Sequence, residues 1–430
     1  MKYAIIIQVG HKKGSEQAMV KIAVIGYGVV GSGTVEVFYK NLDSIEKKIG
    51  DSIDIKYILD LRDFSGTPYD EKFIKTFDPI INDDEITVVA EVIGGINPAY
   101  QYVKSLLEAG KSVVTSNKEL VAEKGAELLR IARDKKVNFF FEASVGGGIP
   151  IIRPLHHCLS ANEIDEIAGI LNGTTNFILT KMISEGMAFD EALSLAQKLG
   201  YAERDPTADI DGHDACRKIC ILASLAFGKH VYPKDVHTEG ISAITAEDVQ
   251  YCDDFGGRIK LIGWASKKGD KAAVMVCPAF ISDTSQLSSV NDVFNAILVR
   301  GDATGDVMFY GKGAGKLPTA SAVVSDIIMA AKMNDSSKSL YWEDAEQPFV
   351  LERKSLDNRF YLRLICEDKS KTLNEAEKMW GKLKLLHRDG ESDNELAFVI
   401  ESINEDKFDR DCSTISENAE IKGKIRVLDY

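Results

Sequence analysis

The sequence predicts an α/β protein in three parts, the first of which is an open parallel sheet with helices on both faces. Apolar strand-like runs alternate with helical patterns at the start of the chain. Longer helices mix with strand-like runs in the middle, and the tail has a strand–helix–strand–strand–helix–strand order. The corresponding ranges are 20–150, 151–333 and 359–430, with an N-terminal extension over 1–19 and a linker over 334–358.

The first range contains a series of apolar runs that we interpret as strands. Lys21–Ile25 is followed by a glycine turn and a helix to about Leu42, and IDIKYILDL, ITVVAEVIGG, KSVVTSN and VNFFFEAS follow in order. Helix-like segments such as AYQYVKSLLEAG separate them. Apolar strands that alternate with helices are typical of a parallel sheet that is buried on both faces.

The middle range has a different pattern, because long helical segments such as DACRKICILASLAFG accompany strand-like runs such as KAAVMVCPAFI. We expect an α+β domain for substrate binding and subunit contacts here. The polar segment NDSSKS begins the linker. The tail, from RFYLRLIC to KIRVLDY, has the βαββαβ order of a small ferredoxin-like module. Met19 stands just before the first strand, so we interpret residues 1–18 as an appended tail.

Charge and cysteine content restrict the class of partner. The formal net charge of −14, without a long basic run, argues against nucleic acid and against an anionic membrane. The first apolar run is too short for a signal peptide or a membrane helix. The seven cysteines are scattered without a CxxC pair, which argues against a zinc site or a disulfide framework. We therefore expect reduced thiols in a cytoplasmic protein.

The glycine turn GYGVVG has the GxGxxG spacing of a dinucleotide-binding turn. Such glycines allow a tight turn, close approach of a pyrophosphate and close packing of the following helix, whose N-terminus favours phosphate charge. Glycine turns also join strands to helices in proteins that bind no nucleotide. Because this turn follows a clear strand and opens a clear helix, we predict a Rossmann-like domain that contacts NAD or NADP through Gly26, Gly28, Val29, Val30 and Gly31.

Charged residues follow later strands of the same domain. Asp60 ends the second strand, where it can accept hydrogen bonds from an adenosine ribose, whereas Arg62 favours a 2′-phosphate. Each is equally explained as a surface charge, so the choice between NAD and NADP stays open. Lys118 follows a later strand, and on sequence alone the simpler interpretation is a solvent-exposed lysine at a helix start. The glycines of EASVGGGIP can line a ligand or an ion, or form a hinge.

The stretch YAERDPTADIDGHDACRK is rich in carboxylates and ends on a lysine. A calcium loop needs a bidentate glutamate where Lys218 stands, and His213 has no second zinc ligand at a useful spacing. We predict Asp211 as the N-cap of a helix on which Asp214 and Lys218 share a face. An exposed ion pair is the simpler account, but the helix is otherwise apolar. Apolar surroundings lower the pKa of a lysine, as proton transfer near neutral pH requires, and we favour a catalytic or substrate role.

At this stretch the chain resembles the homoserine dehydrogenase family. AQKLGYAERDPTADIDGHDACRK is similar to the family signature, and GYGVVGSG, VIGGINPAY, VVTSNKELVA, FEASVGGGIPII, LNGTTNFIL and YGKGAGKLPTASAVVSD resemble further family motifs in the same order. The resemblance covers roughly Val20 to Ala331. It implies NAD(P)-dependent interconversion of L-homoserine and L-aspartate 4-semialdehyde, in the pathway to threonine and methionine.

The resemblance also implies roles for individual residues. It makes Lys218 the acid/base lysine and Lys118 a second lysine near the nicotinamide and the reacting oxygen. Glu203 and Asp214 match the carboxylates that hold the substrate in the family. The resemblance therefore implies that the acidic stretch binds the substrate and is not a metal site. The implied cofactor-lining residues are Gly94, Lys118, Gly200, Glu203 and Gly315. Backbone carbonyls of Glu142, Val145, Gly147 and Ile149 match a site for a monovalent cation, Na⁺ or K⁺.

The tail resembles the ACT regulatory module that some family members carry, which implies threonine as a candidate effector. The turn EDKSKTL (367–373) departs from the usual Asp-x-Pro-Gly of that module. The family also implies a homodimer or homotetramer. Two other functions stay open: an NAD(P)-linked dehydrogenase of another amino-alcohol, and a cofactor-sensing regulator. A regulator has no need of Lys118, Asp214 and Lys218, all of which this chain has.

Overall fold

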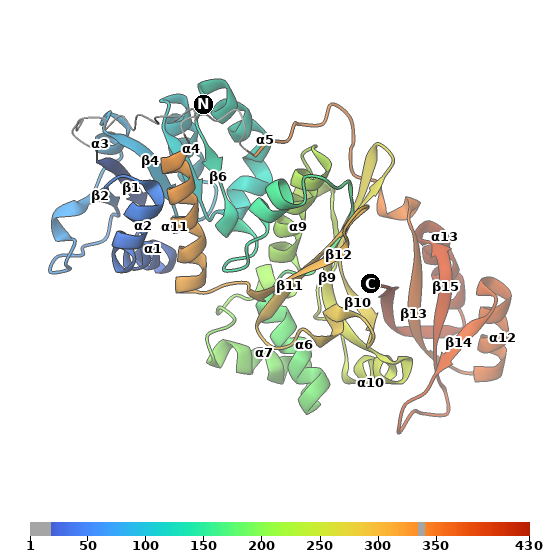
Figure 1. Cartoon of the computed structure of the whole chain (residues 1–430). Coiled ribbons are helices and arrows are strands. Elements are labelled where there is room, and N and C mark those ends of the chain that lie inside the picture. Colours follow the sequence, from blue (N-terminus) through green and yellow to red (C-terminus); the bar gives the residue numbers. More distant parts are fainter. Residues whose placement is uncertain (1–18, 334–339) are drawn as a thin grey trace, which may run out of the picture.

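The computed structural model describes residues 19–333 and 340–430. The tail predicted over 1–18 and the NDSSKS segment at 334–339 lie outside these described residues. In Figure 1 the parallel sheet, a central mixed sheet and the C-terminal module follow one another across the molecule in chain order. No helix in the described ranges is long and apolar enough to cross a membrane.

The N-terminal sheet, sheet A, has six strands that all run parallel. In spatial order they are β3 (Phe73–Ile74), β2 (Ile53–Leu59), β1 (Val20–Ile25), β4 (Ile86–Glu91), β5 (Ser112–Thr115) and β6 (Phe139–Phe140). The central strand β1 is apolar because Ile22 to Ile25 are fully buried between the helix layers. The predicted parallel Rossmann-like sheet is confirmed.

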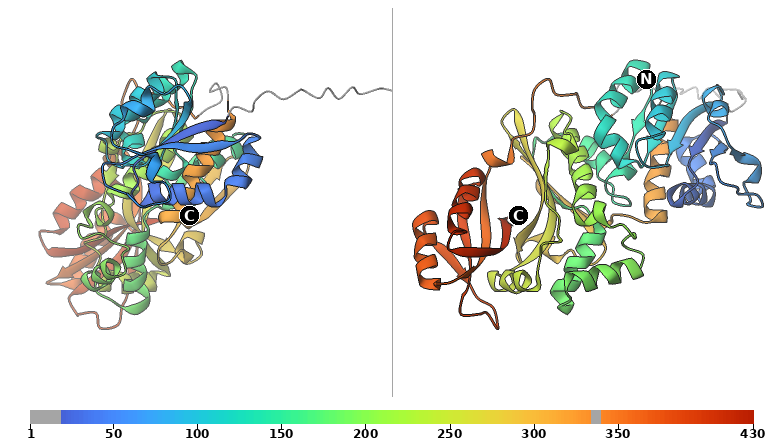
Figure 2. Two further views of the ribbon diagram at one scale, coloured as in Figure 1. Left: turned by 90° about the vertical axis from the view of Figure 1, so that its left-hand side faces the viewer. Right: turned by 180° about the vertical axis from the view of Figure 1, so that it is seen from behind.

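Helices cover both faces of sheet A, as Figures 1 and 2 show. One face carries α4 (Ala99–Glu108) and α5 (Lys118–Lys135), with the short α3 (Asp78–Ile81) beside them. The other face carries α1 (Val29–Lys40) and α2 (Leu42–Ile49). This second face also receives α11 (Lys316–Lys332), which contacts α1, β4 and β5. The range 151–333 therefore ends with a helix that returns to the first sheet, a long-range contact that the sequence pattern does not reveal.

The second sheet, sheet B, is mixed and joins the middle of the chain to its tail. Parallel pairing of Ala279–Ile281 on β10 with Arg426–Leu428 on β16 joins the two parts. The C-terminal module thus extends the central sheet. In spatial order the strands are β12 (Gly305–Lys312), β11 (Phe294–Gly301), β7 (Ile164–Ile170), β9 (Gly257–Lys268), β10 (Lys271–Ser282), β16 (Ala419–Leu428), β13 (Asp357–Cys366), β15 (Glu395–Asn404) and β14 (Leu383–Leu386), with β8 (His237–Thr238) paired to β10.

The central part carries the helices α6 (Gly173–Glu185), α7 (Phe189–Lys198), α8 (Thr207–Ile210) and α9 (His213–Phe227). The apolar side of α9 packs on β7, β9 and β10, and the same helix also contacts α5 of the first domain. Ile219, Cys220 and Leu222 of α9 are fully buried in this packing. Helix α9 therefore lies between sheet B and α5 of the first domain (Figure 1).

The C-terminal module has the βαββαβ order that the sequence predicts, with helices α12 (Lys369–Trp380) and α13 (Glu405–Ile415). Apolar side chains of β13 and β15 form a buried cluster with these helices. The opposite face of the module's strands meets α10 (Ala246–Phe255). There the buried Asp248 accepts hydrogen bonds from the hydroxyl of Tyr361 and from Nε of Arg363, each at 3.0 Å. The module is thus fixed to the central part by a buried charged contact.

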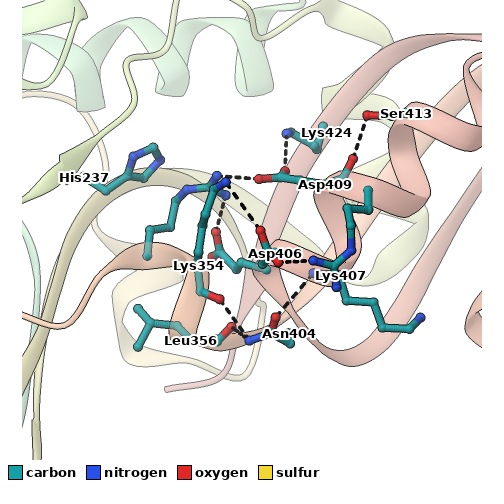
Figure 3. Close-up of polar contacts among 12 residues, drawn as sticks. His237, Lys354, Leu356, Asn404, Asp406, Lys407, Asp409, Ser413 and Lys424 are labelled. Atoms are coloured by element: carbon teal, nitrogen blue, oxygen red, sulfur yellow. Dashed lines mark hydrogen bonds and ion pairs between the residues drawn. The ribbon is translucent and has the colours of Figure 1, made fainter.

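The start of α13 is tied to the segment that leads into the module (Figure 3). Oδ1 of Asn404 accepts a hydrogen bond from the Lys407 backbone N–H at 3.3 Å and so caps the helix. The Asn404 amide donates to the backbone carbonyls of Lys354 and Leu356 at 3.0 and 3.4 Å. One asparagine therefore satisfies backbone groups of both segments.

Candidate active site

The turn between β1 and α1 is shaped by close backbone contact. Gly26 has a φ of +100°, and its carbonyl oxygen lies 1.9 Å from where a Cβ atom would stand on Gly31. A Cβ atom on Gly28 would meet nothing within 4 Å. Within the described chain no side chain caps α1, so its first backbone N–H groups face the open space beside Gly28. Val29 in the same turn is 68% exposed. The turn has the room and the donors that a pyrophosphate needs.

The predicted ribose contacts Asp60 and Arg62 are paired with each other. Nε and Nη2 of Arg62 donate to the two oxygens of Asp60 at 3.0 and 2.8 Å. The backbone N–H groups of Arg62 and Tyr27 donate to the same two oxygens at 2.9 and 2.8 Å. The Arg62 guanidinium and these backbone donors hold the pKa of the Asp60 carboxyl well below its usual value. All acceptor positions of Asp60 are thus filled before any ribose arrives.

Other predicted residues lie at the carboxyl ends of sheet A strands, the edge at which open parallel sheets bind ligands. Gly94 follows β4 with a φ of +86°, Lys118 begins α5 just after β5, and Glu142 follows β6. The strand order reverses between β1 and β4, which places the crevice beside Gly26 and Gly94. Backbone geometry therefore collects these residues although they are far apart in the chain.

Asp214, Lys118 and Lys218 form one ionic cluster. Nζ of Lys118 lies 2.5 Å from Oδ1 of Asp214, and Nζ of Lys218 lies 2.7 Å from Oδ2. Lys218 also donates to the Leu171 backbone carbonyl at 2.7 Å. Asp214 and Lys218 are buried, whereas the Lys118 side chain is 40% exposed. Contact between α5 and α9 brings the lysine of the first domain to the acid of the second.

Burial and charge act in opposite directions on these groups. Burial lowers the pKa of Lys218 below the usual lysine value, and the charge of Lys118 adds to this although Asp214 opposes it. Burial alone would raise the pKa of Asp214, but the charges of Lys218 and Lys118 outweigh it and hold that pKa well below its usual value. Burial also favours a neutral Lys118, but Asp214 raises its pKa. Lys218 is thus the lysine suited to releasing and taking up a proton.

Two further polar residues complete the cluster, and the sequence assigned neither of them a role. The Asn172 amide donates to Asp209 at 2.6 Å and to Asp214 at 2.9 Å, while its Oδ1 caps α6 by accepting from the Thr175 N–H at 2.8 Å. Burial raises the pKa of Asp209. Asparagine before a helical pattern is an N-cap signal, so LNGTT predicts the cap, but its contact with the acids arises only in the fold.

The prediction that Asp211 is the N-cap of the helix that carries Asp214 and Lys218 is wrong. Asp211 ends the short helix α8, and the N-cap of α9 is Gly212 with a φ of +82°. A left-handed residue is needed to turn the chain from α8 into α9, and glycine takes that conformation without steric cost. Asp214, two residues later, stands in the first turn of α9, where the helix dipole favours its negative charge.

A cavity of about 700 Å³ opens over the ionic cluster, between the two sheets. Glu203 is exposed at its rim, after the end of α7, and Gly315 lines it where α11 begins. The predicted site residues that line this cavity are Val29, Val30, Lys118, Val145, Gly147, Gly200, Glu203, Asp214, Lys218 and Gly315. A larger hollow of about 1130 Å³ lies beside α6 and α10 and is lined by other residues. The candidate active site is therefore the smaller cavity, which the predicted residues line.

The loop from Glu142 to Ile149 forms one wall of this cavity. The buried Glu142 carboxylate accepts from the backbone N–H groups of Ile151, Ile152 and Arg153 at 2.7, 2.8 and 2.9 Å. Outside helices and strands, none of the hydrogen bonds of the described residues ends on the carbonyl oxygens of Val145, Gly147 or Ile149. These three oxygens are therefore without a donor in that set of hydrogen bonds.

The fold and the site together define an NAD(P)-dependent oxidoreductase that acts on a CH–OH group. The family described as "Homoserine dehydrogenase, NAD binding domain" matches residues 26–142, and the family described as "Homoserine dehydrogenase" matches residues 150–328. The chain belongs to the homoserine dehydrogenase family. Its activity is the interconversion of L-homoserine and L-aspartate 4-semialdehyde, a step of amino-acid biosynthesis.

Individual relatives agree with this assignment. The Bacillus subtilis homoserine dehydrogenase is 44% identical over 317 residues, which is 73% of each chain. The crystal structure of a homoserine dehydrogenase from Thiobacillus denitrificans superposes with a TM-score of 0.88 at 34% identity and covers 96% of this chain and 98% of its own. A hyperthermophilic archaeal homoserine dehydrogenase in complex with NADPH has a TM-score of 0.63 at 30% identity over 74% of this chain and 99% of its own.

The two glycines of the turn predict different effects of one substitution. Gly31→Ala forces the backbone away from the Gly26 carbonyl, so we expect the free energy of unfolding to fall by about 1–3 kcal/mol. Gly28→Ala, the matched control, is expected to change stability by less than about 0.5 kcal/mol but to weaken NAD(P) binding about tenfold, because the methyl group enters the pyrophosphate space. Denaturant unfolding and fluorescence titration of NAD(P)H measure the two effects, and equal stability of the two variants would contradict this prediction.

The Asp60–Arg62 pair predicts a change in cofactor preference. In Arg62→Ala the Asp60 carboxylate is free to accept a hydrogen bond from the 2′-hydroxyl of NAD, while the cation for the 2′-phosphate of NADP is lost. We expect the ratio of kcat/KM for NAD to that for NADP to rise about tenfold. Arg130→Ala, which removes an exposed arginine of α5, is the control. An unchanged ratio in Arg62→Ala would exclude Arg62 from cofactor selection.

Proposed function

We propose that Lys218 is the acid/base of the homoserine dehydrogenase reaction and that Lys118 is a second lysine beside the reacting oxygen. The observation that supports this most directly is the Asp214 carboxylate, which lies 2.7 Å from the amine of Lys218 and 2.5 Å from that of Lys118 at the cavity wall. A shared buried carboxylate fixes both amines at one place. The two amines differ in their surroundings, because the Lys218 side chain is more buried than that of Lys118.

The geometry supports a defined path for the proton. Nζ of Lys218 donates one hydrogen bond to Asp214 and one to the Leu171 carbonyl. A third hydrogen-bonding position on Nζ is left for the substrate. In homoserine oxidation the neutral amine takes the proton of the substrate hydroxyl, and in the reverse direction the ammonium returns it. The positive charge of Lys118 stabilises the negative charge that develops on the oxygen. NAD(P)⁺ supplies the acceptor for the hydride.

We assign the carboxylates around the cavity to the ammonium group of the substrate. Glu203 at the rim and Asp209 near Asn172 line the cavity together with Asp214. Because Asp214 is already paired with two lysines, its main role is to orient them, and Glu203 and Asp209 are left for the ammonium. Carboxylates at this position favour a zwitterionic amino acid over a simple hydroxy acid.

For the cofactor we propose that both NAD and NADP are accepted through the end of β2. NADP requires Arg62 to leave Asp60 for the 2′-phosphate, and Lys75 stands close because its amine donates to the backbone carbonyls of Asp60 and Arg62. The archaeal relative bound to NADPH supports the use of the phosphorylated cofactor. NAD instead requires a ribose hydroxyl to displace Arg62.

We also propose that Na⁺ or K⁺ binds to the backbone carbonyls of Glu142, Val145, Gly147 and Ile149. The unpaired carbonyl oxygens and the anchored Glu142 support this assignment. Gly147 is in left-handed conformation, and a Cβ atom there would stand 2.3 Å from the Gly313 carbonyl oxygen. The ion would therefore order a loop that packs directly against the loop before α11.

The remaining proposals concern regulation and assembly. We propose that residues 359–430 form an ACT-like module with threonine as candidate effector, that the enzyme is a homodimer or homotetramer, and that it acts in the cytoplasm. The βαββαβ order supports the first proposal. The cysteines of the described chain are free, and all but Cys158 are buried, which supports a reducing compartment.

The assigned role of Lys218 predicts loss of chemistry without loss of cofactor. Reduction of NAD⁺ and of NADP⁺ with L-homoserine in alkaline buffer, followed at the nicotinamide absorbance, measures turnover. We expect Lys218→Ala to lower kcat by at least about 10³-fold, while NAD(P)H affinity changes less than about threefold. A large loss of cofactor affinity would contradict the assignment. Wild-type protein that binds cofactor without homoserine turnover would favour a regulator or a dehydrogenase of another amino-alcohol.

The charge of Lys118 predicts a shift in the pH profile. Lys118 lowers the pKa of Lys218, so in Lys118→Met that pKa rises and a higher pH is needed to obtain the neutral base. We expect the acidic limb of kcat/KM for homoserine oxidation to move to higher pH, in addition to a loss of kcat. Lys124→Met on the same helix is the control and should leave the limb in place. A shift to lower pH in Lys118→Met would contradict the proposed coupling.

A further inference from the structure

Asn295 is a buried side chain of the substrate cavity without an assigned role. It is the second residue of β11, it is 2% exposed, and it lines the cavity together with Asn172, Asp214 and Lys218. Its Oδ1 is buried and accepts no hydrogen bond from any of the described residues. A buried amide oxygen without a donor is unfavourable, so a group that enters the cavity and donates to it is stabilised.

Two glycines make room for this carboxamide. A Cβ atom on Gly313 would stand 2.1 Å from Nδ2 of Asn295, and one on Gly173 would stand 3.4 Å from Oδ1 and 2.8 Å from the Val293 carbonyl oxygen. Both glycines also line the cavity. The carboxamide therefore lies between the N-terminus of α6 and the loop before α11, and its oxygen faces the first residue of α6.

The backbone beside Asn295 is firmly held. The amide of Asn176 on α6 donates to the carbonyl oxygens of Val290, Asp292 and Phe294 at 3.1, 3.0 and 3.2 Å. The Asp292 N–H donates to the hydroxyl of Thr180 at 3.0 Å. These bonds fix the segment that leads into β11, so the position of the Asn295 carboxamide is set before a ligand binds.

The neighbouring acceptors are already occupied. Oδ1 of Asn172 accepts from the Thr175 N–H, and Oδ2 of Asp214 accepts from Lys218 and from Asn172. Oδ1 of Asp214 accepts no hydrogen bond from the described residues, but the Lys118 ammonium is paired with it at 2.5 Å. Of the donors on the substrate, the hydroxyl is assigned to Lys218, which leaves the three N–H bonds of the α-ammonium. Glu203 and Asp209 supply negative charge for that group, and a neutral acceptor can take a further N–H without adding charge.

We propose that Asn295 contacts the substrate, with Oδ1 accepting one N–H of the α-ammonium of L-homoserine. The contact selects the amino acid against the corresponding hydroxy acid, because the latter cannot donate to the buried oxygen and leaves it unpaired. This inference rests on the substrate cavity proposed above.

Asn295→Ala tests the contact when two ligands are compared. We expect the KM for L-homoserine to rise about 10- to 100-fold, the effect of losing a hydrogen bond to a charged group. The inhibition constant of 4-hydroxybutanoate, which lacks the ammonium, should change less than about twofold, and NAD(P)H affinity should stay the same. Asn138→Ala is the matched control: Asn138 is also 2% exposed with an unpaired Oδ1, but it does not line this cavity. The KM of Asn138→Ala for L-homoserine should equal that of the wild type.

Other outcomes overturn the proposal. Equal weakening of both ligands would mean that Asn295 does not contact the ammonium, and a loss of NAD(P)H affinity would mean that it acts through the loop at Gly313. If Asn295→Ala does not fold, Asn295→Asp carries the test: it keeps the acceptor, so homoserine KM should change less than about threefold while 4-hydroxybutanoate binds more weakly. Unchanged kinetics in an active enzyme refute this contact alone, whereas a wild type without homoserine turnover refutes the proposed function.

Discussion

The structure of the site depends on one buried carboxylate, Asp214. A carboxylate removed from water is stable only when positive charge and hydrogen-bond donors surround it, and here Lys118, Lys218 and the Asn172 amide supply them. These partners come from α5, α9 and the start of α6. The charge requirement of this side chain therefore links the first domain to the central part, beside the packing of α5 on α9. Lys118 and Lys218 contact this carboxylate at different degrees of burial. The pKa of Lys218 is therefore lowered, whereas that of Lys118 is raised.

Close backbone approach is the second constraint on the cavity. Gly31 allows α1 to pack on the Gly26 carbonyl, and Gly147 allows the loop after β6 to meet the Gly313 carbonyl. At both places a side chain would push apart the walls that line the cofactor and substrate spaces. Glycine therefore serves here to permit contact between backbones.

The C-terminal module is connected to the site through continuous structure. Arg426 of β16 pairs with the buried Glu405 and reaches Glu239 at 2.8 Å. Two residues beyond Glu239, the Ile241 N–H donates to the Ile210 carbonyl at the end of α8, the helix that carries Asp209. The module thus touches the segment that carries Asp209, a residue that lines the cavity. Sheet pairing between β10 and β16 makes this connection part of one sheet.

The sequence by itself determined the parallel sheet, the glycine turn, the βαββαβ order of the tail and the pairing of Asp214 with Lys218. Each of these follows from hydrophobic periodicity, from turn residues or from the spacing of side chains along one helix. Tertiary structure decided the rest. The position of Lys118 on Asp214, the contact of Asn172 with Asp214 and the return of α11 to the first sheet each join segments that are far apart in the chain, and no local pattern encodes their meeting. Asp211 is a local case in which the sequence pattern did not predict the structure. It was predicted as a cap, but the turn from α8 into α9 required the left-handed backbone of Gly212 instead. Local periodicity is set by the chain's own geometry, whereas partners across the cavity are set by how the two sheets pack.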